Sequence, residues 1–69
     1  GGSMSKIAIP YDIYNKEGDL IEIDFQDQEG QSVLVALWDE NDAQTSENRI
    51  EFRKWAKGMV KRKGYEVHE

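Results

Sequence analysis

The sequence predicts an α+β fold: a three-stranded antiparallel meander packed on one C-terminal amphipathic helix, with 65–67 as a candidate short fourth strand. Two observations predict this fold. One turn pattern occurs twice, at 15–19 and at 27–31, with an alternating strand on either side. After residue 48, apolar residues recur instead with the period of an α-helix.

The two repeated turns set the strand register that we expect. Each turn begins with Asn or Asp and reaches a Gly after two polar residues, which is typical of a type I turn closed by a glycine bulge. We pair Asn15 with Asp19 and Asp27 with Gln31 and count outward, which places one set of side chains under the helix. That set is Ile9, Tyr11, Ile13, Ile21, Ile23, Phe25, Val33, Val35 and Leu37.

The three predicted strands differ in their pattern. The first, 6–14, contains Pro10, which cannot donate a backbone hydrogen bond, so we expect it to be an edge strand. The middle strand, 20–26, alternates apolar and polar residues. The third, 32–38, is apolar on both faces, and this pattern is typical of a strand that is covered on both sides.

The helix is predicted from one apolar stripe and from signals at its two ends. Asn48 and Glu51 resemble a capping box, and Asp42 and Ser46 are alternative starts. Basic residues fill 61–63, where the helix dipole favours them, and Gly64 supplies a left-handed stop. The stripe consists of Phe52, Trp55, Ala56, Met59 and Val60.

Length and composition predict one small domain. Gly1, Gly2 and Ser3 before Met4 look like the remnant of an expression tag, so we take 4–69 as the domain. Without cysteine, neither disulfides nor a thiolate metal site stabilises the fold. No apolar run approaches the roughly 20 residues that span a bilayer. We therefore expect no membrane association and a cytoplasmic location.

The net charge of −5 hides two segments of opposite sign. Residues 1–48 carry two lysines and eleven acidic residues, whereas residues 49–63 carry seven basic residues and one acidic residue. Such an asymmetry can mark an interaction surface. It is equally explained by a basic helix that packs on an acidic sheet.

No pattern of catalytic or metal-binding residues is present. His68 is the only histidine and stands next to the C-terminus, and without cysteine a zinc site is not expected. The acidic segment 39–42 lacks the Gly and the distal Glu of a calcium loop. The paired carboxylates of Asp12 and Glu22 are expected on the outer face of the sheet, where nothing indicates a role in acid–base chemistry. We expect a protein that is not an enzyme and that holds no cofactor or metal.

The side of the sheet away from the expected helix carries a candidate partner-binding patch. In the expected register Tyr14, Leu20 and Trp38 form one row across the strands. Aromatic anchors ringed by carboxylates are typical of a protein-binding surface. The carboxylates beside this row are Asp12, Glu22 and Asp24. In the alternative interpretation the row is covered by the C-terminal tail, by the 39–48 connection or by a second copy of the chain, and a homodimer satisfies both interpretations.

The expected solvent face of the helix carries a second candidate site. Arg53, Lys54, Lys57 and Lys61 form a basic stripe that could follow a phosphate backbone. The alternative is an ordinary solvated helix face.

Three strands followed by one helix resemble the architecture of the AP2-type and integrase arm-type DNA-binding domains. Those families read DNA with arginines and aromatic residues on the exposed sheet face. Here the expected exposed face carries Asp12, Glu22 and Asp24, which repel phosphates, so that binding mode does not carry over.

The sequence therefore leads to three functional hypotheses. The first is a small acidic protein-binding module that docks its sheet face onto a basic partner surface, in the style of phage-encoded inhibitors of host proteins. The second is a nucleic-acid-binding domain that uses the basic helix. The third is a homodimeric structural subunit.

Overall fold

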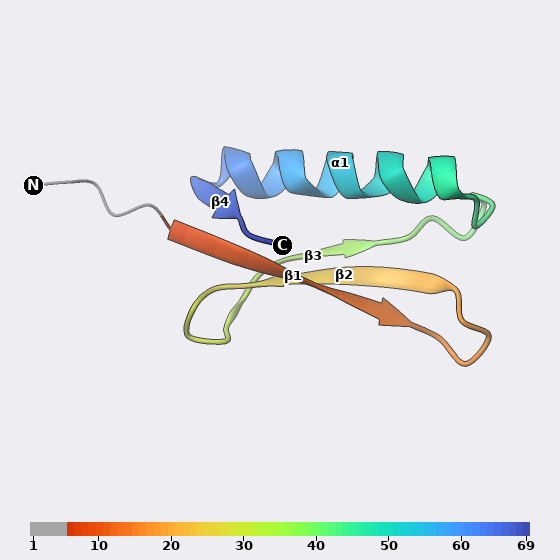
Figure 1. The fold of residues 1–69 in the computed structure, drawn as a ribbon, viewed down its shortest axis with the longest axis horizontal. Helices are drawn as coiled ribbons and strands as arrows, with labels where there is room; N and C mark the ends of the chain where they lie inside the picture. The colour runs from red at the N-terminus through yellow and green to blue at the C-terminus, as the bar shows by residue number, and fades with distance from the viewer. Residues whose placement is uncertain (1–5) are drawn as a thin grey trace, which may run out of the picture.

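One sheet with a helix on one of its faces makes up the described part of the chain, residues 6–69 of a computed structural model (Figure 1). The strands are β1 (Lys6–Tyr14), β2 (Leu20–Gln26), β3 (Ser32–Leu37) and β4 (Tyr65–Val67), and the helix is α1 (Ser46–Arg62). The strand order is β3-β2-β1-β4, with β4 parallel to β1 and the other pairs antiparallel. The expected tag remnant and Met4 lie outside the described residues.

Both turns adopt the predicted conformation. Gly18 and Gly30 have φ values of 85° and 86°, which a residue without a Cβ adopts at little cost. Asn15 Oδ1 accepts hydrogen bonds from the backbone N–H of Glu17 and of Asp19. Asp27 Oδ1 bonds the second turn in the same way. The repeated turn sequence therefore builds two hairpins of the same type.

The predicted register beyond these turns is wrong, because each hairpin contains a β-bulge. Tyr14 pairs with Leu20 as expected, but Ile13 pairs with Glu22, so Ile21 is an extra residue. In the second hairpin Val33 is the extra residue. A bulge reverses the alternation of side chains beyond it.

Because of the bulges, part of the core consists of side chains that the sequence assigned to solvent. Leu20 and Ala36, which were expected to point outward, are buried beneath α1. Within β2 the bulge brings Leu20 onto the same side as Ile23 and Phe25, which were correctly expected in the core. The expected core positions Tyr11, Ile13, Ile21, Val35 and Leu37 are instead exposed.

The helix meets the sheet through a narrower stripe than predicted. Ala56 and Val60 are buried, and Phe52 packs against the core. Trp55 is 55% exposed, so its place in the predicted stripe is wrong. The helix begins after Thr45, whose side chain caps it by accepting a hydrogen bond from the N–H of Asn48. Of the helix starts considered from the sequence, Ser46 is the one that the structure shows. Gly64, with φ 93°, ends the helix as predicted.

The fourth strand extends the sheet on the side of β1. Ile7 pairs with Glu66 in parallel, and Lys6 lies over the ring of Tyr65. The predicted edge position of β1 is therefore wrong along Lys6–Ala8, where β4 covers it. Pro10 comes just beyond this covered stretch, where β1 is again an edge.

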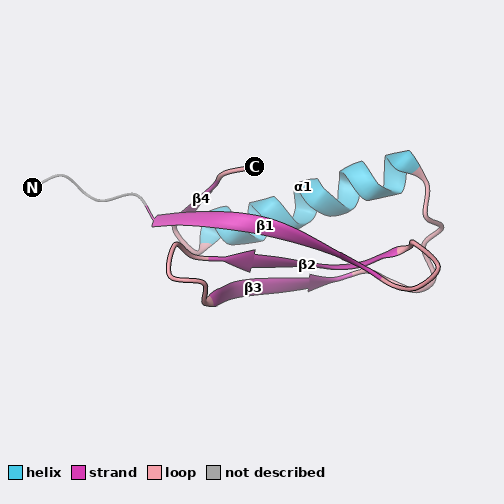
Figure 2. Ribbon diagram, turned by 60° about the horizontal axis from the view of Figure 1, so that its bottom comes forward, coloured by secondary structure: helices cyan, strands magenta, loops and turns pink. Residues whose placement is uncertain are grey.

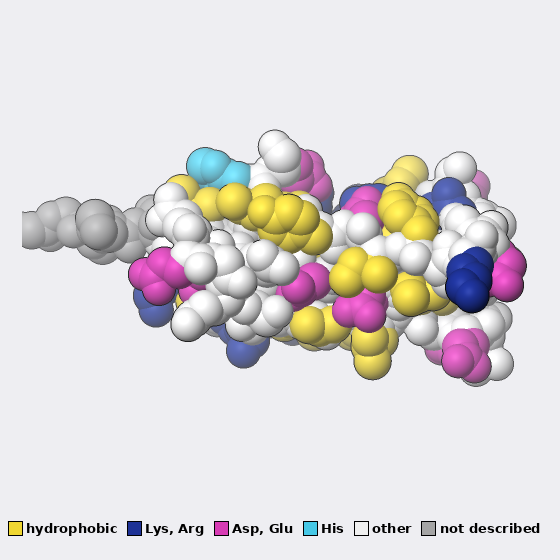
Figure 3. All heavy atoms as spheres, turned by 90° about the horizontal axis from the view of Figure 1, so that it is seen from below, with side chains coloured by type: hydrophobic (Ala, Val, Ile, Leu, Met, Phe, Trp, Pro, Cys, Tyr) yellow, Lys and Arg dark blue, Asp and Glu magenta, His cyan; other side chains and the backbone are white. Residues whose placement is uncertain are grey.

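The face of the sheet turned away from α1 has no element over it in the described chain (Figure 2). Viewed directly, this face shows apolar side chains with acidic ones among them (Figure 3). In the described chain, α1 is not long and apolar enough to cross a membrane.

Candidate functional site

The predicted row of Tyr14, Leu20 and Trp38 lies on the side of α1. Leu20 is fully buried, and Trp38 packs edge-on against Phe52 of the helix, with ring centroids 5.0 Å apart. The Trp38 indole N–H donates to the backbone oxygen of Asp42 at 3.1 Å. Of the three side chains only Tyr14 is largely exposed. The prediction of an exposed row is therefore wrong for Leu20, and Trp38 has only part of its surface free.

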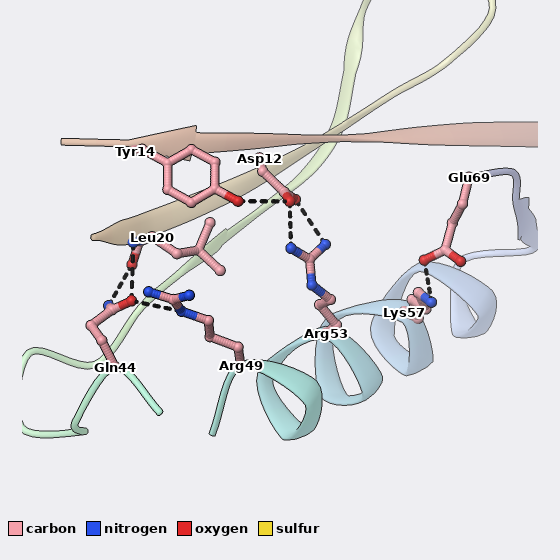
Figure 4. A network of polar contacts seen from close by, with 8 residues as sticks. All are labelled: Asp12, Tyr14, Leu20, Gln44, Arg49, Arg53, Lys57 and Glu69. Carbon is pink, nitrogen blue, oxygen red and sulfur yellow. Dashed lines mark hydrogen bonds and ion pairs between the residues drawn. The ribbon is translucent and has the colours of Figure 1, made fainter. Parts of the chain in front are cut away.

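The 39–48 connection covers Leu20, as the alternative interpretation of the sequence expected. The carboxamide of Gln44 accepts from the backbone N–H of Leu20 at 3.0 Å and donates to its carbonyl oxygen at 2.8 Å (Figure 4). Arg49 donates its Nε–H to the same carboxamide oxygen. An amide side chain thus takes the place of a neighbouring strand beside the first bulge.

Asp12, another residue of the predicted patch, forms an ion pair with the helix. Its carboxylate accepts two hydrogen bonds from the Arg53 guanidinium and one from the Tyr14 hydroxyl (Figure 4). These bonds to Asp12 raise the pKa of Arg53, against the lowering effect of partial burial. The Asp12–Arg53 pair fixes α1 over β1, so its main role is to stabilise the fold.

The predicted basic stripe is divided by such ion pairs. Arg53 points to the sheet and not to solvent. Lys57 pairs with the carboxylate of Glu69, and Lys54 lies 4.0 Å from that of Glu51. Among the four cations of the stripe, Lys61 is the one for which the described residues provide no carboxylate within 4.0 Å. Less positive charge is free for a phosphate backbone than the sequence suggested.

The strongest candidate surface is the opposite side of the sheet, which we call the open face. Its largely exposed side chains come from the two strands that flank β2, and its carboxylates come from β2 itself. Leu37 is 67% exposed and Tyr11 is 48% exposed, which are large values for apolar and aromatic residues in a sheet. The open face consists of Tyr11, Ile13, Glu22, Asp24, Val35 and Leu37.

The register of the strands arranges the open face in two rows. In one row Asp24 stands between Tyr11 and Val35. In the next row Glu22 stands between Ile13 and Leu37. A column of carboxylates therefore runs along β2, with an apolar column on each side of it.

The two carboxylates differ in their contacts. Asp24 accepts hydrogen bonds from Gln26 Nε2 at 2.8 Å and from the Ser32 hydroxyl at 2.7 Å, which hold it in place. Glu22 has no ion-pair partner among residues 6–69. The strands β1, β2 and β3 contain a single basic residue, Lys6 at the start of β1. The field above the open face is therefore negative.

An aromatic groove borders the open face at β3. It lies between the end of β3 and the first half of α1. The ring of Phe52 lies near two indoles of this groove, that of Trp38 and that of Trp55, the latter at a centroid distance of 6.0 Å. Carboxylates of Asp39, Asp42 and Glu51 surround it.

Comparison of the chain with protein-family models, curated proteins and solved structures finds no match. Residues 6–69 also contain no group of three or more His, Cys, Asp or Glu side chains placed to hold a metal ion.

Of the predicted binding residues, the structure keeps only Glu22 and Asp24 on the sheet face away from the helix. The apolar side chains beside them, those of Tyr11, Ile13, Val35 and Leu37, were expected in the core. The alternation of the strands correctly put these four on one face together. One signal in the sequence indicated that these side chains could face away from the helix. The third strand has a second apolar set, Leu34, Ala36 and Trp38, which could form a core equally well.

Proposed function

We propose that the protein is a non-enzymatic protein-binding module whose open face docks onto a basic, partly apolar surface of another protein. The observation that supports this proposal is the column of Glu22 and Asp24 between two columns of exposed apolar side chains. Apolar side chains provide binding energy when they leave water, and aromatic residues such as Tyr11 are frequent anchors. A module of this kind inhibits or modulates its partner by occupying the surface that it binds.

The carboxylates determine the chemistry of the partner. Docking an apolar surface onto the open face removes water from Glu22 and Asp24, and this desolvation is unfavourable unless a cation compensates for it. A partner surface with lysine or arginine side chains flanked by aliphatic ones fits the carboxylate column and the apolar columns at once. Complementary charge also speeds the encounter of the two proteins.

The same carboxylates disfavour a second copy of the chain on the open face. In a two-fold dimer through the centre of this face, the column of Glu22 and Asp24 would meet the same column of the other copy. Like charges would then be desolvated and brought together. We therefore propose a different protein as the occupant of the open face.

A photo-crosslinking experiment tests this function. A benzophenone amino acid replaces Tyr11 on the open face in one sample, and Lys54 on the exposed side of α1 in a matched sample. We expect the Tyr11 position to crosslink to a distinct protein in a lysate of the cells that make this chain, and the Lys54 position not to do so. Purified partner then allows the affinity to be measured by calorimetry.

Charge reversal provides the decisive comparison. We expect Glu22→Lys to weaken the interaction by about tenfold or more, because it opposes a desolvated cation of the partner. Lys54→Glu, which also changes the net charge by two units but lies on the helix, should leave the affinity nearly unchanged. Equal crosslinking from both positions, or an affinity that is indifferent to Glu22→Lys, would show that the open face is not the binding surface. Circular dichroism checks that each variant is folded.

A further inference from the structure

Strand β3 ends the sheet on one side with an open edge. The strand order puts β3 outermost, and no element of the described chain lies beyond it (Figure 2). At the opposite side of the sheet, β4 covers the first part of β1, and Pro10 follows where that cover ends. The two edges differ, since β4 is only three residues long and the uncovered part of β1 contains Pro10, whereas β3 presents six residues without a proline.

The hydrogen-bond pattern identifies the free backbone groups. The N–H of Trp38 donates to the oxygen of Ile21, and in an antiparallel ladder the residues that bond to the neighbour alternate. Leu34 and Ala36 therefore also point their backbone groups towards β2. Val35 and Leu37 point theirs outward. The side chains of these two residues are also largely exposed.

The sequence of β3 has no charge and no proline that would prevent pairing. Its sequence, SVLVAL, has an uncharged and mostly apolar composition that favours the addition of a further strand. The one protective feature is the bulge at Val33, near the beginning of the strand. An extended chain can pair with the remainder.

The charges near the two ends of β3 indicate which extended chain pairs with this edge. Helix α1 runs antiparallel to β3 in Figure 1, so the end of β3 lies near the acidic start of the helix and the beginning of β3 lies near its basic end. The acidic end includes Asp39, Asp42 and Glu51. The basic end includes Arg62 and Lys63, and here Lys63 and Lys6 line a hollow together with one carboxylate, that of Asp27 in the turn before β3.

Antiparallel pairing of β3 with the β3 of a second copy exchanges these two ends. A two-fold axis beside Val35 would bring the acidic end of each copy to the basic end of the other. On α1, Glu51 and Trp55 line a groove together with Leu37, and helical periodicity puts Arg62 on the same side of the helix as these two residues. This surface is self-complementary, whereas the open face is not.

We propose that two copies of the chain pair through their β3 edges and form one continuous sheet. Glu51 of each copy then faces Arg62 of the other across the two-fold axis. The carboxylates on β2 stay one strand away from the axis, so the open faces of both copies remain free and side by side. This inference does not depend on the proposed function of the open face.

The oligomeric state tests the pairing. Sedimentation equilibrium of the wild-type chain should give a mass that rises with concentration from 8.0 kDa towards twice that value. Val35→Pro removes the outward N–H and should keep the chain monomeric. Val35→Ala, the matched control, keeps the N–H and should still dimerise. A wild-type chain that stays monomeric at millimolar concentration overturns the proposal, as does a dimer that Val35→Pro leaves unchanged.

A charge exchange provides a second test that does not rely on a proline in a strand. Glu51→Lys alone and Arg62→Glu alone should each weaken the dimer by about tenfold, because each puts like charges opposite one another. An equimolar mixture of the two variants should restore dimers, since opposite charges then meet at both positions. If mixing restores nothing, the two helices do not face each other as proposed.

Discussion

Replacing Leu20 by alanine is expected to lower the free energy of unfolding by about 2–5 kcal/mol, whereas the same replacement at Ile21 costs about 1 kcal/mol or less. Leu20 is fully buried beneath α1, and its loss leaves a cavity in a core that has seven buried side chains among residues 6–69. Ile21 is 38% exposed and occupies the bulge. In a domain of this size the first change is large enough to unfold a substantial fraction of the molecules.

Urea unfolding of both variants, followed by circular dichroism, measures the difference. A regular hairpin without the bulge predicts the opposite order, with Ile21 in the core and Leu20 on the surface. The pair of variants therefore tests the bulge itself. Equal losses at the two positions would contradict the structure described above. Val35→Ala provides a reference for an exposed strand position and should change the free energy of unfolding by about 0.5 kcal/mol at most.

Gln44→Ala is expected to cost about 1–3 kcal/mol, which is a large effect for a side chain outside the regular elements. The carboxamide satisfies both backbone groups of Leu20 through two hydrogen bonds that are partly buried. Removing it leaves the Leu20 N–H and carbonyl oxygen without their protein partner. The contact between the 39–48 connection and the sheet is lost at the same time.

Two further variants separate this effect from the general loss of a side chain. Gln44→Glu keeps the acceptor for the Leu20 N–H and the partner of Arg49, but places an acceptor against the Leu20 carbonyl oxygen, so its cost should be intermediate. Gln28→Ala, in the exposed turn between β2 and β3, should change the stability by about 0.5 kcal/mol at most. If Gln44→Ala were as mild as Gln28→Ala, the carboxamide would have no structural role.

The sequence was sufficient to predict the local features of the fold. The Gly residues of the two turns and Gly64 after the helix predicted three positions of positive φ, and all three are found. These signals are local, because each depends on the conformation of one or two residues. The candidate fourth strand at 65–67 is likewise confirmed.

The side of the sheet that α1 covers could not be derived in the same way. A bulge inserts one residue without any special residue type, so the pattern around Ile21 and Val33 does not show where the alternation reverses. Leu20 and Ile21 are both aliphatic, and β3 is apolar on both faces. Only tertiary packing decides between such equivalent sets. The candidate site followed the same error, because the predicted inward and outward side chains of β1 and β3 exchanged places, while Glu22 and Asp24 of β2 stayed on the outer face.

The parallel pair of β1 and β4 has a consequence for the order in which the fold forms. The two hairpins join neighbouring segments and close short loops, whereas the contact of Lys6 with Tyr65 joins segments from opposite ends of the sequence. Contacts of long sequence separation lose more chain entropy when they form, so β4 should join the sheet after the hairpins and the helix. Amide hydrogen exchange should then be fastest, among the strands, at the three residues of β4. Protection of β4 equal to that of Ile23 and Phe25 would instead show that the chain closes in a single step.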